Sequence, residues 1–249
     1  MKKQYVTVNG ASASTATFIN GGETIRLSIS EKVSPRKKLV LPLKVLFEDE
    51  YLALIRKPAG ILVSGNRFKT VANALNQNIE PSSLPDSINP QPIHRLDYAT
   101  TGVLLIGKTS SSIRVLNEKF KSKKVRKTYY AITIGEMNES GTITSDIDGK
   151  ESHTDCLVKQ SVPSERFTKL NLLQLTPQTG RRHQLRKHLS SIGNPILGDR
   201  EYGIEGLLLR GKGLYLHAYS LEFTHPFTNQ LVYVTDELPQ KFRKIFSDK

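Results

Sequence analysis

An arginine and an aspartate stand two residues apart in the segment Ile93-His94-Arg95-Leu96-Asp97, just before a strongly apolar run. If this segment is extended, Arg95 and Asp97 point to the same side, because side chains alternate along extended backbone. A carboxylate on a loop that leads into a buried strand suits nucleophilic or acid–base chemistry, since the strand positions it and the loop leaves it accessible. The alternative is an ion pair that closes a turn. These residues alone favour that alternative, because such pairs are common.

Two basic segments are candidates for binding an anionic substrate. The first carries six positive charges within nine residues: Lys119, Lys121, Lys123, Lys124, Arg126 and Lys127. We interpret it as a rim that faces phosphate groups. In the second, Thr179 is expected to cap a helix that ends at Gly193, and its Arg182 and Arg186 then present two guanidinium groups, one turn apart, to phosphate or carboxylate. The expected buried stripe of this helix is Leu185, Leu189 and Ile192. For both segments the alternative is an ordinary solvated surface.

The charge of the chain supports an anionic partner. Its 249 residues include 36 Lys and Arg against 23 Asp and Glu, a net charge of +13, so a polyanion is expected, with nucleic acid first and an acidic membrane surface second. No apolar run approaches the ~20 residues needed to cross a bilayer, and the N-terminus lacks the apolar core of a signal peptide, so we expect a cytoplasmic protein. The one cysteine, Cys156, excludes an intrachain disulfide and a cysteine-rich zinc site, and we expect no metal.

Apolar patterns predict the elements that must position these residues. Val103 to Ile106 is expected to be a strand buried on both faces, directly after the loop of Asp97. In the strand expected over 128–135, Tyr129 and Tyr130 point to opposite faces, one into the core and the other toward a cleft. The other expected strands lie at 45–47, 51–55, 170–175, 214–223 and 231–235, with a weak hairpin over 141–160, helices at 70–76, 110–120 and 239–246, and a proline-rich loop at 81–92.

The first 39 residues have a different character. Residues 4 to 30 alternate around the turn signals Asn9-Gly10 and Asn20-Gly21-Gly22, which predicts a small β-hairpin unit. Charge and proline in Ser34-Pro35-Arg36-Lys37-Lys38 then indicate a linker near 31–39. We therefore expect a small unit and linker over residues 1–39 and one large domain over 40–249.

Five motifs in one order, covering most of 45–235, resemble the RluA family of RNA pseudouridine synthases. They are His94-Arg95-Leu96-Asp97 with Thr101-Gly102, Lys127-Thr128-Tyr129-Tyr130-Ala131 with Gly135, Thr179-Gly180-Arg181-Arg182-His183-Gln184-Leu185-Arg186, Gly193-Asn194-Pro195-Ile196-Leu197-Gly198-Asp199 with Tyr202-Gly203, and Leu216-His217-Ala218. The resemblance implies an α+β pseudouridine synthase fold, in which a mixed, mostly antiparallel central sheet is flanked by helices. It also implies that the uracil of a uridine in RNA is detached from C1′ at N1 and rejoined through C5, without cofactor or metal.

The resemblance also implies roles for individual residues. Asp97 is the catalytic residue, either as the nucleophile at C1′ or by taking a ribose proton. Arg186 is its cationic partner, and a close Arg typically lowers a carboxylate pKa by about 1–3 units. Tyr129 contacts the base and is a candidate for taking the C5 proton, while Arg95 fills the gap left by the flipped uridine or holds the displaced nucleotide. The remaining substrate-binding residues are expected to be His94, Leu185, Arg181, Arg182 and Lys127.

Two departures and two alternatives accompany this interpretation. Thr101 replaces a serine more usual before the glycine, and residues 1–39 resemble only the later, strand-bearing part of an S4 RNA-binding module, so we expect a remnant that does not bind RNA independently.

The first alternative is a catalytically inactive RNA-binding protein of the same fold. The second is a glycoside hydrolase, which usually needs a second carboxylate that these motifs lack. The expected partner is ribosomal or transfer RNA, and nothing demands more than a monomer.

Overall fold

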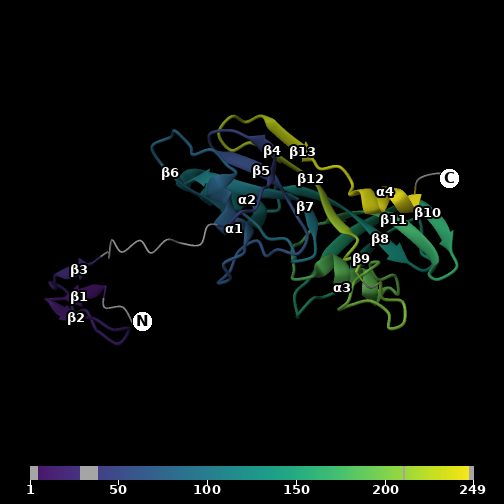
Figure 1. Ribbon diagram of the computed structural model, residues 1–249, viewed down its shortest axis with the longest axis horizontal. Helices are drawn as coiled ribbons and strands as arrows, with labels where there is room; N and C mark the ends of the chain where they lie inside the picture. Colours follow the sequence, from purple (N-terminus) through teal and green to yellow (C-terminus); the bar gives the residue numbers. More distant parts are fainter. Residues whose placement is uncertain (1–4, 29–38, 210, 247–249) are drawn as a thin grey trace. The chain divides into compact units, whose positions relative to one another are not determined.

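The computed structural model describes residues 5–28, 39–209 and 211–246 (Figure 1). The chain divides into two compact units, residues 1–38 and 39–249. In the first unit, β1 (Val6–Val8) lies between β2 (Ala11–Ser12) and β3 (Ile25–Leu27) in an antiparallel sheet. Asn9 and Gly10 both have positive φ, 50° and 85°, as the expected hairpin turn requires. The predicted linker lies almost entirely outside the described residues.

The second unit is built on a ten-stranded sheet in the order β4-β5-β7-β12-β8-β11-β10-β9, with β13 paired to β12 and β6 paired to β7. The β7–β12 pair is parallel, and the other strand pairs of the described chain are antiparallel. The predicted mixed, mostly antiparallel sheet is thus confirmed (Figure 1). The strands are β4 (Lys44–Glu48), β5 (Leu52–Lys57), β6 (Ser87–Pro92), β7 (Thr101–Thr109), β8 (Arg126–Ile134), β9 (Ser140–Thr144), β10 (His153–Ser164), β11 (Thr168–Pro177), β12 (Leu216–Thr224) and β13 (Leu231–Thr235).

Helices cover both faces of the β5–β7 part of this sheet. Leu104 and Ile106 of β7 pack in one core with α1 (Val71–Ala74), which a short 3-10 turn (Leu75–Gln77) extends. Val103 and Leu105 pack in another core with Leu116 of α2 (Ser110–Lys121). Because both sets of side chains are fully buried, the prediction of a strand buried on both faces is confirmed. A third core lies under β8 and β11 and includes side chains of α3 (Gln184–Ser191) and α4 (Gln240–Phe246).

Three local predictions are wrong. The helix expected to start at Thr179 begins at Gln184, because His183 has left-handed backbone with φ 55°, which a helix cannot include. Ile192, expected in its buried stripe, lies past the last helical residue and is 45% exposed. The proline-rich loop at 81–92 contains a strand, β6. In the described sheet β6 pairs with β7 alone, and an edge strand tolerates proline because one row of its backbone groups needs no partner.

The parallel β7–β12 pair requires glycine at one position. Gly102 has φ 116°, and a Cβ there would lie 2.1 Å from the carbonyl oxygen of Ala218. The two backbones can therefore approach only without a side chain at residue 102. This close contact fixes the start of β7, which directly follows the loop of Asp97.

Candidate active site

A cleft of about 570 Å³ lies between the segment 92–100, the start of β8 and the segment 177–186. Asp97 lines it with 23% of its side chain exposed. All nine site residues predicted from the sequence line this cleft, namely His94, Arg95, Asp97, Lys127, Tyr129, Arg181, Arg182, Leu185 and Arg186. Three segments far apart in the chain thus meet at one place, and the roles of these residues stay predictions.

The loop of Asp97 is held from the inside of the protein by Lys57, at the end of β5. The Lys57 ammonium is fully buried and donates hydrogen bonds to the carbonyls of Pro58, Tyr98 and Thr100 at 3.0, 3.2 and 2.9 Å. Burial lowers the pKa of Lys57 to about 8, although the charge of Asp97 opposes this. Sequence reasoning missed Lys57 as a site residue, although a lysine closing an apolar strand was an available signal.

A second anchor joins this loop to β12. The hydroxyl of Thr101 and Nδ1 of His217 are 2.8 Å apart, and Nε2 of His217 lies 3.2 Å from the carbonyl oxygen of Asp236. His217 is buried, and burial lowers its pKa below the usual value. The Asp97 loop is therefore fixed by buried groups on both flanks, which restricts the positions its carboxylate can take.

Arg186 approaches Asp97 from α3, with Nη1 3.8 Å from Oδ2 of the aspartate. Its stronger partner is Asp199, whose two oxygens accept from Nε and Nη2 at 2.7 and 2.8 Å. Glu201 accepts from Nη2 at 3.1 Å, and the guanidinium carbon lies 4.8 Å from the ring centre of Tyr202. Burial would raise the pKa of Asp199, but the hydrogen bonds and charge of Arg186 hold it below its usual value. Arg186 is thus aimed at Asp97 by the partners that hold its other nitrogens.

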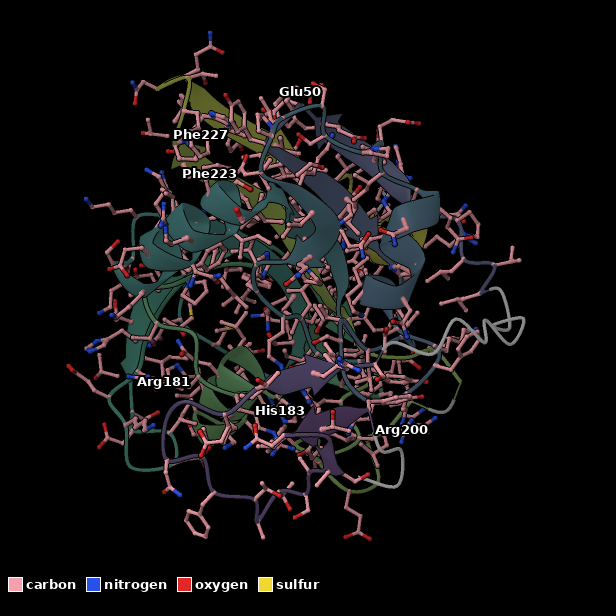
Figure 2. The ribbon with its side chains drawn as sticks, turned by 90° about the vertical axis from the view of Figure 1, so that its left-hand side faces the viewer. Glu50, Arg181, His183, Arg200, Phe223 and Phe227 are labelled. Atoms are coloured by element: carbon pink, nitrogen blue, oxygen red, sulfur yellow. The ribbon has the colours of Figure 1, made fainter. Side chains whose placement is uncertain are left out.

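The expected pairing of Arg182 with Arg186 on one helix side is wrong. Arg182 precedes α3 and is exposed, while Arg186 lies on α3 and is buried. The residue between them and closer to Asp97 is His183, whose Nε2 lies 3.7 Å from Oδ1. Its Nδ1 lies 3.0 Å from the hydroxyl of Tyr202. His183 and Arg181 lie beside α3, the green helix in Figure 2.

The Asp97 carboxylate itself accepts no hydrogen bond from the part of the chain that the structure describes. Among the described residues, the basic groups within 4 Å of its oxygens are Arg186 and His183, at 3.8 and 3.7 Å, which is beyond hydrogen-bond range. The oxygens therefore keep their lone pairs for a substrate. His183 was not among the predicted site residues, although it lies within the motif that contains Arg186.

The two tyrosines of β8 face opposite sides, as predicted, and both are half-buried side chains that pack against the core. Tyr129 lines the cleft, where burial and then the charge of Asp97 raise its pKa above the usual value. Tyr130 is half-buried on the other face, packed edge-on against Tyr219 and 3.4 Å from Oε1 of Gln174. Tyr129 is therefore a neutral phenol at neutral pH.

The remaining predicted substrate-binding residues differ in how accessible they are. His94 accepts a hydrogen bond from the backbone of Leu105 through Nε2 at 3.1 Å, and burial, then the charge of Lys127, lower its pKa to about 4. It is thus a neutral wall residue. Leu185 is buried in the cleft floor, and Lys127 donates to the carbonyl of Thr179 at 3.3 Å. The exposed cations that line the cleft are Arg95, Arg181 and Arg182.

Two further features of the described residues bear on the class of site. No group of three or more His, Cys, Asp or Glu side chains is placed to hold a metal ion. No described helix is both long and apolar enough to cross a membrane. Cys156 is buried in the core beside β11, as expected of a small packing residue.

The fold and this cleft agree with a known class. Residues 51–191 match the family described as RNA pseudouridylate synthase, which is more than half of the chain. The chain therefore belongs to the RNA pseudouridylate synthase family, an isomerase family, as the resemblance predicted.

Relatives along nearly the whole chain support this assignment. The chain is 33% identical over 261 residues to ribosomal large subunit pseudouridine synthase D of Nitrosomonas europaea, covering 96% of this chain and 75% of the relative. It is 34% identical over 236 residues to tRNA pseudouridine synthase C of Haemophilus ducreyi, covering 83% and 96%. Among solved structures, human RNA pseudouridylate synthase domain containing 4 matches with a TM-score of 0.63 and 25% identity, over 80% of this chain and 90% of that one.

Proposed function

We propose that this RNA pseudouridine synthase acts on uridines of ribosomal or transfer RNA and that Asp97 is its catalytic residue. The reaction breaks the N1–C1′ bond, forms a C5–C1′ bond, releases the proton of C5 and leaves a proton on N1. Relatives named for large-subunit ribosomal RNA and for transfer RNA support both substrate classes. The observation that carries the role of Asp97 is a carboxylate free of hydrogen bonds from the described chain, with Arg186 at 3.8 Å, in a cleft rimmed by exposed arginines.

The surroundings of Asp97 are consistent with both routes left open by the sequence. As a nucleophile it needs unoccupied lone pairs, and as a base toward a ribose proton it needs the ionised form. Arg186 supports either role, because its positive charge stabilises the carboxylate without engaging it. Tyr129 then packs against the uracil as a neutral phenol. Because its pKa is raised, it can accept the C5 proton only if it gives up its own phenolic proton to another group.

The exposed arginines of the cleft support capture of a flipped uridine. Unstacking a base from folded RNA costs a few kcal/mol, which contacts to the flipped nucleotide and its phosphates must offset. Arg95, Arg181 and Arg182 are exposed at the cleft, and they are our candidates for those contacts. Arg95 in particular lies two residues from Asp97 and is our candidate for filling the gap in the RNA. Phosphate contacts of this kind make binding weaken steeply with salt.

For the first 38 residues we propose the S4-like remnant expected from the sequence. Support comes from its small three-stranded sheet, whose side chains are half-buried or exposed. Such a sheet offers little core of its own. We propose that it contributes little RNA affinity by itself. Comparing RNA binding by residues 1–38 with binding by the full chain tests this, and comparable affinities would contradict it.

The experiment that tests the enzyme assignment is pseudouridine mapping. Ribosomal and transfer RNA from cells lacking the protein are compared with RNA from cells given back either wild type or Asp97→Asn. We expect one or more sites to vanish and to return with wild type alone. Restoration by Asp97→Asn contradicts the role of Asp97. If no site changes in the deletion, the alternative of an inactive RNA-binding protein is favoured.

A further inference from the structure

A second hollow lies on the face of the sheet that Tyr129 does not face. Side chains on this face come from cross-strand pairs, in which Arg126 is opposite Glu222 and Tyr130 is opposite Gln174. Along β11 the residues from 173 to 178 alternate between buried odd and accessible even positions, and β13 repeats the pattern with Leu231 and Tyr233 exposed. The strands β13, β12, β8, β11 and β10 therefore present an accessible face.

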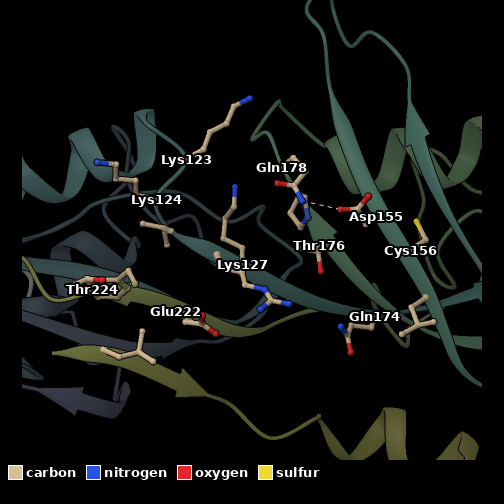
Figure 3. A pocket seen from close by; sticks show the side chains of 16 residues that line it. Lys123, Lys124, Lys127, Asp155, Cys156, Gln174, Thr176, Gln178, Glu222 and Thr224 are labelled. Atoms are coloured by element: carbon tan, nitrogen blue, oxygen red, sulfur yellow. Dashed lines mark hydrogen bonds between the residues drawn. The ribbon is translucent and has the colours of Figure 1, made fainter. Parts of the chain in front are cut away.

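This face is hollowed into a groove of about 670 Å³, within the range of about 300–1,000 Å³ typical of ligand sites (Figure 3). One end of the groove is cationic. Lys123 and Lys124 are exposed there, and neither forms an ion pair within the described residues. Exposed lysines without a close ion pair are available to a ligand of negative charge, and phosphate is the anion for which such clusters are suited.

Hydrogen-bonding side chains of a different kind line the groove along β11 and β12. Gln178 donates to Asp155 at 2.9 Å, and Gln174 and Thr176 lie on the same face of β11. Glu222 lines the groove opposite Arg126. Amides and carboxylates read the edges of bases, where carboxylates accept from amino groups and amides both donate and accept. A groove that places cations beside these groups matches a nucleotide, with its phosphate and its base.

The groove adjoins the active-site cleft. Lys127 and Pro177 line both hollows, at the adjacent ends of β8 and β11. A strand whose uridine occupies the cleft would reach the groove by passing Lys127. An acidic peptide would also supply negative charge. It has no base edge, however, and nothing connects it to a substrate in the adjoining cleft.

We propose that this groove binds nucleotides flanking the target uridine in the same RNA, with Lys123 and Lys124 on its phosphates and Gln174, Thr176 and Gln178 on a base. The proposal rests on the proposed function, because it assigns the groove to that substrate. It also predicts that the enzyme prefers long substrates to fragments that end close to the uridine.

A crosslinking experiment tests occupancy of the groove. The one native thiol, Cys156, is buried, and burial raises its pKa to about 11, so Thr176→Cys introduces a single reactive thiol in the groove. A photoactivatable aryl azide attached there is irradiated with total cellular RNA, and the crosslinked positions are mapped. The matched control carries the same label at Lys44→Cys, an exposed position at the start of β4. Crosslinks within a few nucleotides of the mapped pseudouridine support the proposal. Yields no higher than the control, or crosslinks to protein instead of RNA, overturn it.

A binding experiment tests the phosphate contacts separately. Lys123→Ala/Lys124→Ala is compared with Lys44→Ala/Lys244→Ala, which removes the same charge at exposed positions outside both hollows. We expect the slope of log affinity against log salt to fall by about 2 for the groove variant on long RNA and to stay unchanged on a short fragment. Equal slopes for the two variants on long RNA overturn the proposal. Failure of the proposed function is distinguishable, because wild type would then form no pseudouridine although crosslinking still reports on the groove.

Discussion

Replacing Lys57 by methionine tests whether a buried ammonium holds the Asp97 loop. Hydrogen bonds from a charged donor contribute about 1.5–3 kcal/mol each, and Lys57 makes three of them. Burying the ammonium opposes this, because lowering its pKa from 10.5 to about 8 corresponds to a cost of about 3 kcal/mol. We therefore expect Lys57→Met to lower the free energy of unfolding by about 2–5 kcal/mol, measured by urea titration at pH 7.

The same variant should slow catalysis, because the carbonyls of Tyr98 and Thr100 lose their donor. The matched control is Lys241→Met. Lys241 lies on α4, donates to the carbonyl of Leu214 at 2.7 Å and also has its pKa lowered to about 8 by burial. It lines neither hollow. We expect Lys241→Met to lose stability with turnover per folded molecule unchanged. A loss below 1 kcal/mol for Lys57→Met, or equal turnover in both variants, would refute the reasoning.

The pH dependence of Lys57 has a definite sign. Its pKa in the folded protein is about 8, below the value near 10.4 of an unfolded chain, so between these values the unfolded chain binds more protons. Raising the pH from about 8 toward 10.4 should therefore stabilise wild type relative to Lys57→Met. Turnover should fall over the lower part of this range, because the donor loses its charge. If turnover falls at alkaline pH in the same way in Lys57→Met as in wild type, the group that titrates there is not Lys57.

Three further predictions concern the active site. Arg186→Lys keeps the positive charge but loses the paired hydrogen bonds from Nε and Nη2 to Asp199. We therefore expect kcat to fall at least tenfold while RNA affinity changes less than about twofold. A loss confined to binding would make Arg186 a phosphate contact. Arg182→Ala removes an exposed cation, so the salt slope of binding should fall by about 1 with kcat unchanged, and a changed kcat would contradict this. Gly102→Ala forces a Cβ to 2.1 Å from the Ala218 carbonyl, so we expect about 2–5 kcal/mol of lost stability by thermal unfolding, and a wild-type melting temperature would contradict the close approach.

The elements of this fold follow largely from local patterns. The β13 strand was predicted with the bounds observed, and α2 extends only one residue beyond its predicted end, because alternation and helical periodicity are local properties. The residues of the cleft were found as a set because they lie within motifs. Bringing segments 92–97, 127–129 and 181–186 together required the whole sheet, which no single segment encodes.

The parts that were missed depend on contacts between distant residues or on one backbone conformation. Arg186 was expected to serve Asp97, but its fork is completed by Asp199, which lies beyond the end of α3. Lys57 reaches the Asp97 loop from β5, 41 and 43 residues away from its acceptors Tyr98 and Thr100. The left-handed backbone of His183 delays α3 and removes Arg182 from it. None of these features leaves a periodic signal in the sequence.

The position of β12 has a consequence for how the active site forms during synthesis. β12 is near the end of the chain, yet it lies between β7 and β8 in the sheet, and the contact of Thr101 with His217 spans 116 residues. Until β12 has left the ribosome, β7 and β8 each have an unpaired edge, and such long-range pairing forms slowly. The Thr101–His217 contact beside the Asp97 loop can therefore form only once β12 is available. A nascent chain that lacks β12 can fold its local hairpins but has no assembled catalytic cleft.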